Sequence, residues 1–119
     1  MTFEFTELDY STMYTIIKEF ALIDKSEAYK NGDKAEVVGY KDARLGKAYI
    51  NIAFILDAEG WIYTIGVFKD AYCEEAICLM QVITEFDGSH PVVVPLDEEQ
   101  YISCAGIPEV AIMRGARRL

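Results

Sequence analysis

The sequence has a single histidine and no cluster of glycines, and these two shortages exclude several common kinds of active site. With only His90 available, no mechanism or metal site that needs two histidines can form within one chain. The eight glycines are scattered singly and match neither the G-x-G-x-x-G nor the G-K-[ST] pattern of phosphate-binding loops. Ser89 precedes His90, but neighbours in sequence seldom meet in triad geometry, and no G-x-S-x-G motif is present. We therefore expect a non-enzymatic protein without a cofactor.

Cysteines are few, and long apolar runs are missing. Cys73, Cys78 and Cys104 show no C-x-x-C spacing, so the sequence predicts neither a disulfide framework nor a zinc site. The start, MTFEFTEL, lacks the positive and continuously apolar parts of a signal peptide, and no run approaches the roughly 20 apolar residues that cross a bilayer. The acidic clusters at 74–75 and 97–99 do not resemble an EF-hand loop. We expect a cytoplasmic protein with reduced thiols, no metal and no membrane contact.

Positive charge is nearly absent from residues 48–113. Between Lys47 and Arg114 the only cation is Lys69, while eleven acidic residues give this stretch a formal charge of −10. The whole chain carries −9. Such a stretch repels nucleic acid and attracts basic surfaces. The arginines at 114, 117 and 118 form a cluster too small to reverse this, so direct nucleic-acid binding is opposed.

The residues that are present are those of one folded domain. A hydrophobic fraction of 52% with 26% charged residues is a globular composition, and 119 residues suffice for a single core, so we expect one domain over 1–119. Apolar residues recur at helical spacing over 10–24, and this helix could run on towards Tyr29. Strands are expected over 36–41, 47–56 and 61–68, with a polar turn at 41–46 and a tight hairpin at 57–60. Residues 3–8 could form a short strand or a packed arm.

A second helix is expected over 70–86. Asp70 would cap it, Glu74 and Glu75 would occupy its first turn, and its apolar face would cover well over a third of its circumference. A short strand follows at 92–94, a further one could form at 101–104, and Pro108 could begin a last helix. The predicted fold is thus α+β: a two-layer domain in which an antiparallel three-strand meander with one or two short strands packs against two main helices.

This order of elements resembles the arrangement of type III secretion chaperones. Helix, meander, helix, short strands and a final helix follow one another there as well, in small acidic proteins, and no sequence motif accompanies the resemblance. It implies a homodimer that holds an extended client on apolar patches, with the broad face of the second helix serving dimerisation.

A binding protein with a basic partner is the function that the sequence favours. Complementary charge accelerates encounter and requires no catalytic residue. Cytosolic inhibitors of nucleic-acid-binding proteins fit this description, including immunity proteins and phage-encoded antagonists that mimic nucleic-acid charge. Eight tyrosines and one tryptophan exceed what a small core needs, and such rings are enriched at interfaces. The residues that we expect to contact the partner are Tyr72, Glu74, Glu75, Glu85, Asp97, Glu98, Glu99 and Tyr101.

Overall fold

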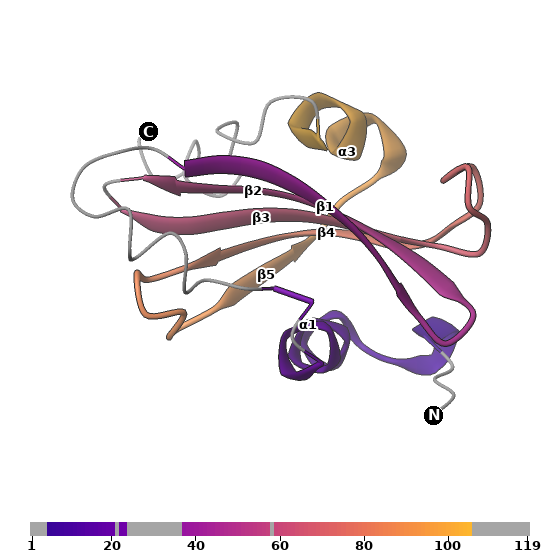
Figure 1. Cartoon of the computed structure of the whole chain (residues 1–119), viewed down its shortest axis with the longest axis horizontal. Coiled ribbons are helices and arrows are strands. Elements are labelled where there is room, and N and C mark those ends of the chain that lie inside the picture. The colour runs from indigo at the N-terminus through magenta and orange to yellow at the C-terminus, as the bar shows by residue number, and fades with distance from the viewer. Residues whose placement is uncertain (1–4, 21, 24–36, 58, 106–119) are drawn as a thin grey trace.

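The centre of the protein is a five-stranded antiparallel sheet in which the strands follow one another in sequence order. The computed structural model describes residues 5–20, 22–23, 37–57 and 59–105. The strands are β1 (Val37–Leu45), β2 (Ala48–Asp57), β3 (Gly60–Phe68), β4 (Ala76–Thr84) and β5 (Val92–Pro95). Helix α1 (Tyr10–Glu19) lies below the sheet and helix α3 (Glu98–Ala105) above it in Figure 1. The predicted α+β class, an antiparallel sheet with two packed helices, is confirmed.

Turn chemistry fixes the first two hairpins. Asp57 and Gly60 face each other across the β2–β3 turn, as the sequence predicts. Gly60 has φ +127°, and a Cβ atom there would collide with the carbonyl oxygen of Thr84, so no other residue fits without strain. The β1–β2 turn lies later than expected, because β1 runs on to Leu45 and the chain reverses at Gly46, where φ is +61°.

The helix expected over 70–86 is wrong: residues 76–84 form strand β4, between β3 and β5. Cys78, Met80 and Val82 are buried in the cluster on the α1 side, while Leu79 and Ile83 are buried in clusters on the other face. A strand buried on both faces reads as a continuous apolar run, which also matches a broadly apolar helix. Asp70 does cap backbone N–H groups, but those of a loop.

The ends of the described chain depart from the expectations as well. Residues 101–104, expected as a strand, belong to helix α3. Of the two possibilities for residues 3–8, the strand is not formed in the described part: Phe5–Glu7 form a short 3₁₀ helix, η1, and Phe5 packs into the main core, as a packed arm would. The Asp9 carboxylate caps α1 by accepting the N–H of Thr12 at 2.7 Å. The possible extension of this helix beyond residue 24 and the helix expected from Pro108 lie outside the described residues.

The main core fills the space between α1 and the sheet. Ile17 of α1 is fully buried there, together with Ile65 and Met80 near the middle of the sheet. The rings of Trp61 and Tyr63 stack at 5.5 Å, and Trp61 Nε1 donates a hydrogen bond to the carbonyl oxygen of Phe86 at 3.0 Å. Among the described helices, none is long and apolar enough to span a membrane.

Candidate functional site

Acidic side chains gather with exposed apolar groups at one end of the sheet, where the β3–β4 loop meets helix α3. A pocket of about 170 Å³ opens between them. We call it the acidic pocket; it is lined by Phe68, Cys73, Glu74, Ala76, Leu79, Glu98, Tyr101 and Ile102. In Figure 1 this end of the sheet carries the β3–β4 loop on the right, and α3 lies above the strands.

A β-bulge brings the sheet residues of the pocket onto one face. Val67 pairs with Cys78 but Phe68 pairs with Ala76, so Ile77 is an extra residue in β4. In a regular strand, Ala76 and Leu79 would point to opposite faces, because successive side chains alternate. The extra residue shifts the alternation, and both side chains line the pocket with Phe68.

The β3–β4 loop is built around the Asp70 carboxylate. Asp70 Oδ1 accepts the N–H groups of Glu75 at 2.8 Å and of Glu74 at 3.0 Å. The hydrogen bond from the Glu75 N–H is the main reason that the pKa of Asp70 lies below its usual value. The N–H of Lys69 also bonds the Glu75 carbonyl at 2.9 Å, which closes the loop. This ordered turn presents Tyr72 to solvent with 85% of its surface exposed.

Helix α3 starts with a reciprocal cap. Asp97 Oδ1 accepts the N–H of Gln100 at 2.8 Å, and Gln100 Oε1 accepts the N–H of Asp97 at 3.0 Å. Glu98 and Glu99 occupy the first turn, where carboxylates interact favourably with the positive end of the helix dipole. The cap thus fixes where Glu98 enters the rim of the pocket.

Tyr101 fastens α3 to the sheet through a chain of hydrogen bonds. Its hydroxyl donates to Asn51 Oδ1 at 3.0 Å, and Asn51 Nδ2 donates to Asp42 Oδ1 at 2.8 Å. Its ring meets that of Phe68 edge to face, with centroids 5.9 Å apart. Gly66 makes this approach possible, because a Cβ atom there would lie 2.8 Å from Tyr101 Oη.

The charged side chains that line the pocket, Glu74 and Glu98, are both acidic. Burial raises the pKa of Tyr101 to about 12, and the charges that Cys73 and Asp42 carry when ionised contribute to the rise. Burial also raises the pKa of the Cys73 thiol, and the negative charges of Asp42 and Asp70 raise it further. Both Tyr101 and Cys73 are therefore uncharged at neutral pH, and Cys73 is not an activated nucleophile.

The described cations at this end of the sheet are Arg44, Lys47 and Lys69, and the acidic side chains outnumber them. The Arg44 guanidinium lies 4.8 Å from the centre of the Tyr49 ring, and Arg44 Nε donates to the Gly46 carbonyl at 3.3 Å. The Arg44 guanidinium thus interacts with residues of its own β1–β2 hairpin. Lys69 is exposed at the start of the β3–β4 loop. Acidic residues outnumber these cations in the adjoining segments, which contain Asp42, Asp70, Glu74, Glu75, Asp97, Glu98 and Glu99.

The structure brings most of the predicted partner-binding residues together and separates one. Glu74, Glu98 and Tyr101 line the pocket itself. Tyr72, Glu75, Asp97 and Glu99 are exposed on the same loop and on the start of α3. Glu85 follows Thr84, at the opposite end of β4 from Ala76 and the pocket. The eight residue steps from Ala76 to Thr84 span about 26 Å along a strand.

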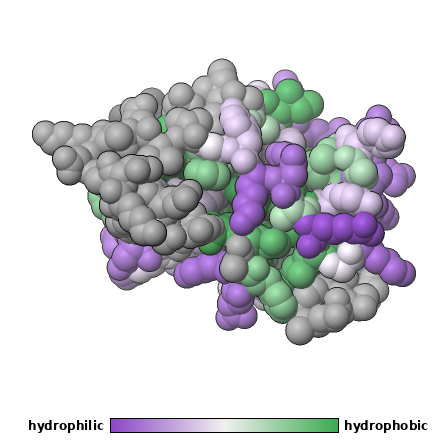
Figure 2. Space-filling view, in the orientation of Figure 1, coloured by the Kyte–Doolittle hydropathy of each residue, from purple (hydrophilic) through white to green (hydrophobic). Residues whose placement is uncertain are grey.

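Several residues of this site are not predicted by the sequence. Asp42 lies on β1, outside the highly acidic stretch, and reaches the site only because the sheet places β1 beside β2. Ile102 is expected in a strand, yet on α3 it is 73% exposed beside the pocket. In Figure 2 a hydrophobic group stands out at the top of the molecule, over α3. The Asp97-x-x-Gln100 capping pattern is the sequence signal that identifies this helix.

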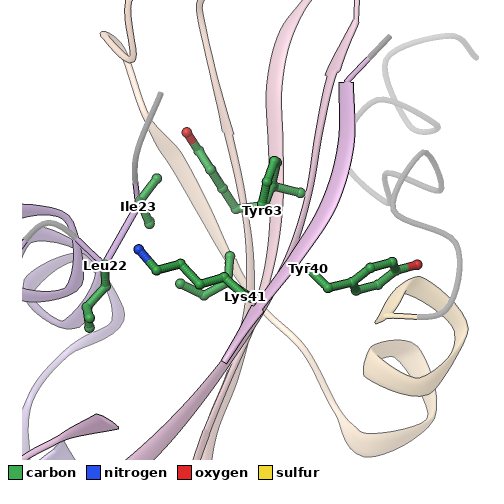
Figure 3. A pocket seen from close by; sticks show the side chains of 7 residues that line it. Leu22, Ile23, Tyr40, Lys41 and Tyr63 are labelled. Carbon is green, nitrogen blue, oxygen red and sulfur yellow. The ribbon is translucent and has the colours of Figure 1, made fainter. Parts of the chain in front are cut away.

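A second cavity, of about 260 Å³, lies on the other side of the sheet. It is lined by Leu22, Ile23, Tyr40, Lys41, Ile52, Phe54 and Tyr63. Figure 3 shows the Lys41 side chain extending towards Leu22 and Ile23, while the Tyr40 ring points away from them. The charged side chain in its lining is the cation Lys41, so the charge of this cavity is opposite to that of the acidic pocket.

The β4–β5 turn holds a serine, a histidine and a glutamate in contact, but not as a catalytic triad. Ser89 Oγ and Glu85 Oε2 both lie close to the same ring nitrogen, His90 Nδ1, at 3.0 and 3.2 Å. A triad uses the two ring nitrogens for different partners. The Glu85 and His90 side chains are largely exposed, as expected for a surface turn.

The Cys78 thiol has a structural role in the core. The Cys78 thiol is buried, donates to Met13 Sδ at 3.1 Å, and has its pKa raised by burial to about 12. No group of three or more histidine, cysteine or acidic side chains that could hold a metal ion occurs in the part of the chain that the structure describes.

Comparisons of the chain with protein-family models, with curated proteins and with solved structures find no match.

Proposed function

We propose that this protein is a small acidic, non-enzymatic binding module, an inhibitor, antagonist or immunity-type protein that engages a basic, nucleic-acid-binding protein. The acidic pocket and the exposed side chains around it form the contact surface. The observation that carries this proposal is that Glu74 of the β3–β4 loop and Glu98 and Tyr101 of helix α3 line one pocket. The partner is a protein with a basic surface, and the chain itself does not bind nucleic acid.

The composition of this surface supports a protein partner. Tyr72 of the β3–β4 loop and Ile102 of α3 are large side chains that are 85% and 73% exposed. Apolar and aromatic groups within a polar surround are the usual anatomy of protein interfaces. The carboxylates supply charge complementarity, which accelerates encounter and selects against acidic partners.

The alternative, a client-binding dimer like the secretion chaperones, loses its main argument. It depended on a broadly apolar helix over 70–86 for the order of elements and for dimerisation. That segment contains β4, which is hydrogen-bonded to strands on both sides and buried over most of its length. We therefore retain the acidic binding module alone.

The proposal is tested with a decalysine peptide as a model of a basic surface. Calorimetric titration at about 50 mM and about 300 mM salt should show binding that weakens by at least about tenfold, because exposed charges are screened as the Debye length shortens. Amide chemical shifts recorded during the titration should change mainly at residues 70–76 and 97–105. Binding that is indifferent to salt, or shifts centred on the β4–β5 turn, would contradict the proposal.

A further inference from the structure

The acidic pocket has walls and a rim of different character. Phe68, Ala76 and Leu79 form the wall on the sheet side, and Tyr101 and Ile102 form the wall on the helix side. The rim carries Glu74 from the loop and Glu98 from the first turn of α3. An apolar interior with carboxylates at its mouth complements a ligand that has an alkyl stem and a cationic head.

The pocket is formed before any partner arrives. The reciprocal Asp97–Gln100 cap, the Asp70 loop bonds and the Tyr101–Asn51 hydrogen bond each hold one side of it. A preformed site loses little conformational entropy on binding, so even a single side chain can be bound selectively.

We propose that the acidic pocket receives one arginine or lysine side chain of the partner protein, with the alkyl stem between Leu79 and Tyr101 and the cationic head at Glu74 and Glu98. This inference rests on the proposed function and specifies its anchor. Arginine and lysine bury their stems against apolar surface while the charged head stays at the edge. Charge-assisted hydrogen bonds to carboxylates are the strong ones, and arginine can make two in parallel.

Other occupants fit the pocket less well. A wholly apolar ligand would leave the two rim carboxylates partly desolvated without a partner, which costs free energy. A hard metal ion prefers several oxygen ligands, whereas most of the lining here is hydrocarbon. An anionic ligand is repelled by the carboxylates of Glu74 and Glu98.

The test uses N-acetyl-arginine amide and its uncharged analogue N-acetyl-citrulline amide, titrated separately into the full chain at low salt. Each probe has nearly the same shape, and only the first carries a charge. Chemical shifts of Leu79, Tyr101 and Ile102 should move with the arginine probe, with a dissociation constant in the millimolar range, and barely move with citrulline. Equal shifts with both probes would overturn the inference.

Three variants locate the binding. Glu74→Gln with Glu98→Gln keeps the pocket volume and removes the rim charge, and should weaken arginine binding by about tenfold, as expected for lost charge-assisted hydrogen bonds. Ala76→Leu fills the pocket from an exposed position and should weaken it to a similar extent with all carboxylates in place. Glu85→Gln, at the far end of β4, should leave the affinity unchanged within about twofold.

These results separate the two proposals from each other. If decalysine binds at the acidic surface but Ala76→Leu has no effect on the arginine probe, the protein uses a diffuse charged face and the anchor is wrong. If the arginine probe binds in the pocket as described while decalysine does not bind in a salt-sensitive way, the anchor stands and the wider charged interface is wrong. Arginine binding weakened equally by Glu85→Gln and by the rim variants would overturn the anchor.

Discussion

At the scale of single residues, one type of side chain has different roles in the core and on the surface. Isoleucine shows this most clearly. Ile65, in the middle of β3, has no exposed surface and packs between the sheet and α1. Ile102, on α3, is 73% exposed. The first contributes to folding through burial, and the second is available to a partner.

We predict that Ile65→Ala lowers the free energy of unfolding by about 2 to 5 kcal/mol, because it removes buried methyl groups and leaves a cavity. The matched control Ile102→Ala should change it by no more than about 0.5 kcal/mol. Urea denaturation of both variants measures these values. Similar losses for the two variants would mean that the burial of one of them is misassigned.

Asp70 gives a residue-scale prediction about pH. Its folded pKa is lowered below 3.8, first by the hydrogen bond from the Glu75 N–H. A lowered carboxyl pKa adds stability that is fully present above the unfolded value and is lost as pH falls through the folded one. The Asp70 carboxyl carbon, followed by NMR, should therefore titrate below pH 3.8, and Asp70→Asn should reduce the acid sensitivity of stability in that range. A midpoint at or above the usual aspartate value would show that the loop bonds do not form in solution.

At the scale of secondary-structure elements, some can be predicted from residues close together in the sequence. Others become either helix or strand depending on how they are buried in the fold. The β2–β3 hairpin is predictable because Asp57 and Gly60, which pair across the turn, are also close together in the sequence. Strand β4 is not, because its apolar residues match a helix until strands on both sides and cover on both faces are known. Helix α3 is hard to predict because the apolar character of Tyr101 and Ile102 also suits a short strand, and only the cap at Asp97 argues for a helix.

Removal of that cap should loosen one wall of the acidic pocket. We predict that Asp97→Ala costs about 1 kcal/mol of stability, the usual effect of losing an N-terminal cap. Faster amide exchange should accompany it in α3, around Gln100 and Tyr101, while β4 remains protected. Exchange that accelerates equally throughout the sheet would mean that α3 and the sheet do not open separately.

At the scale of the whole molecule, sequence and fold supply different parts of the site. Charge and residue type are enough to point to Glu74, Glu98 and Tyr101. Their convergence cannot be derived from the sequence, since it needs the bulge at Ile77, the return of the chain through β5, and Gly66 opposite Tyr101. The same fold moves Glu85 to the far end of β4 and brings in Asp42 from β1. Location on the sheet, more than net charge, therefore distinguishes the acidic residues that we expect to contact a partner from those that only keep the surface solvated.

The most direct test of this account removes equal charge from two places. Glu74→Gln, Glu98→Gln and Glu99→Gln act at the acidic pocket and the start of α3. Glu7→Gln, Glu19→Gln and Glu85→Gln change exposed glutamates on η1, at the end of α1 and after β4, so both triple variants have the same net charge. The affinity for decalysine, measured by calorimetry at low salt, should fall by at least about tenfold in the first and by less than about twofold in the second. Equal losses in the two variants would contradict the claim that the acidic pocket is the binding surface.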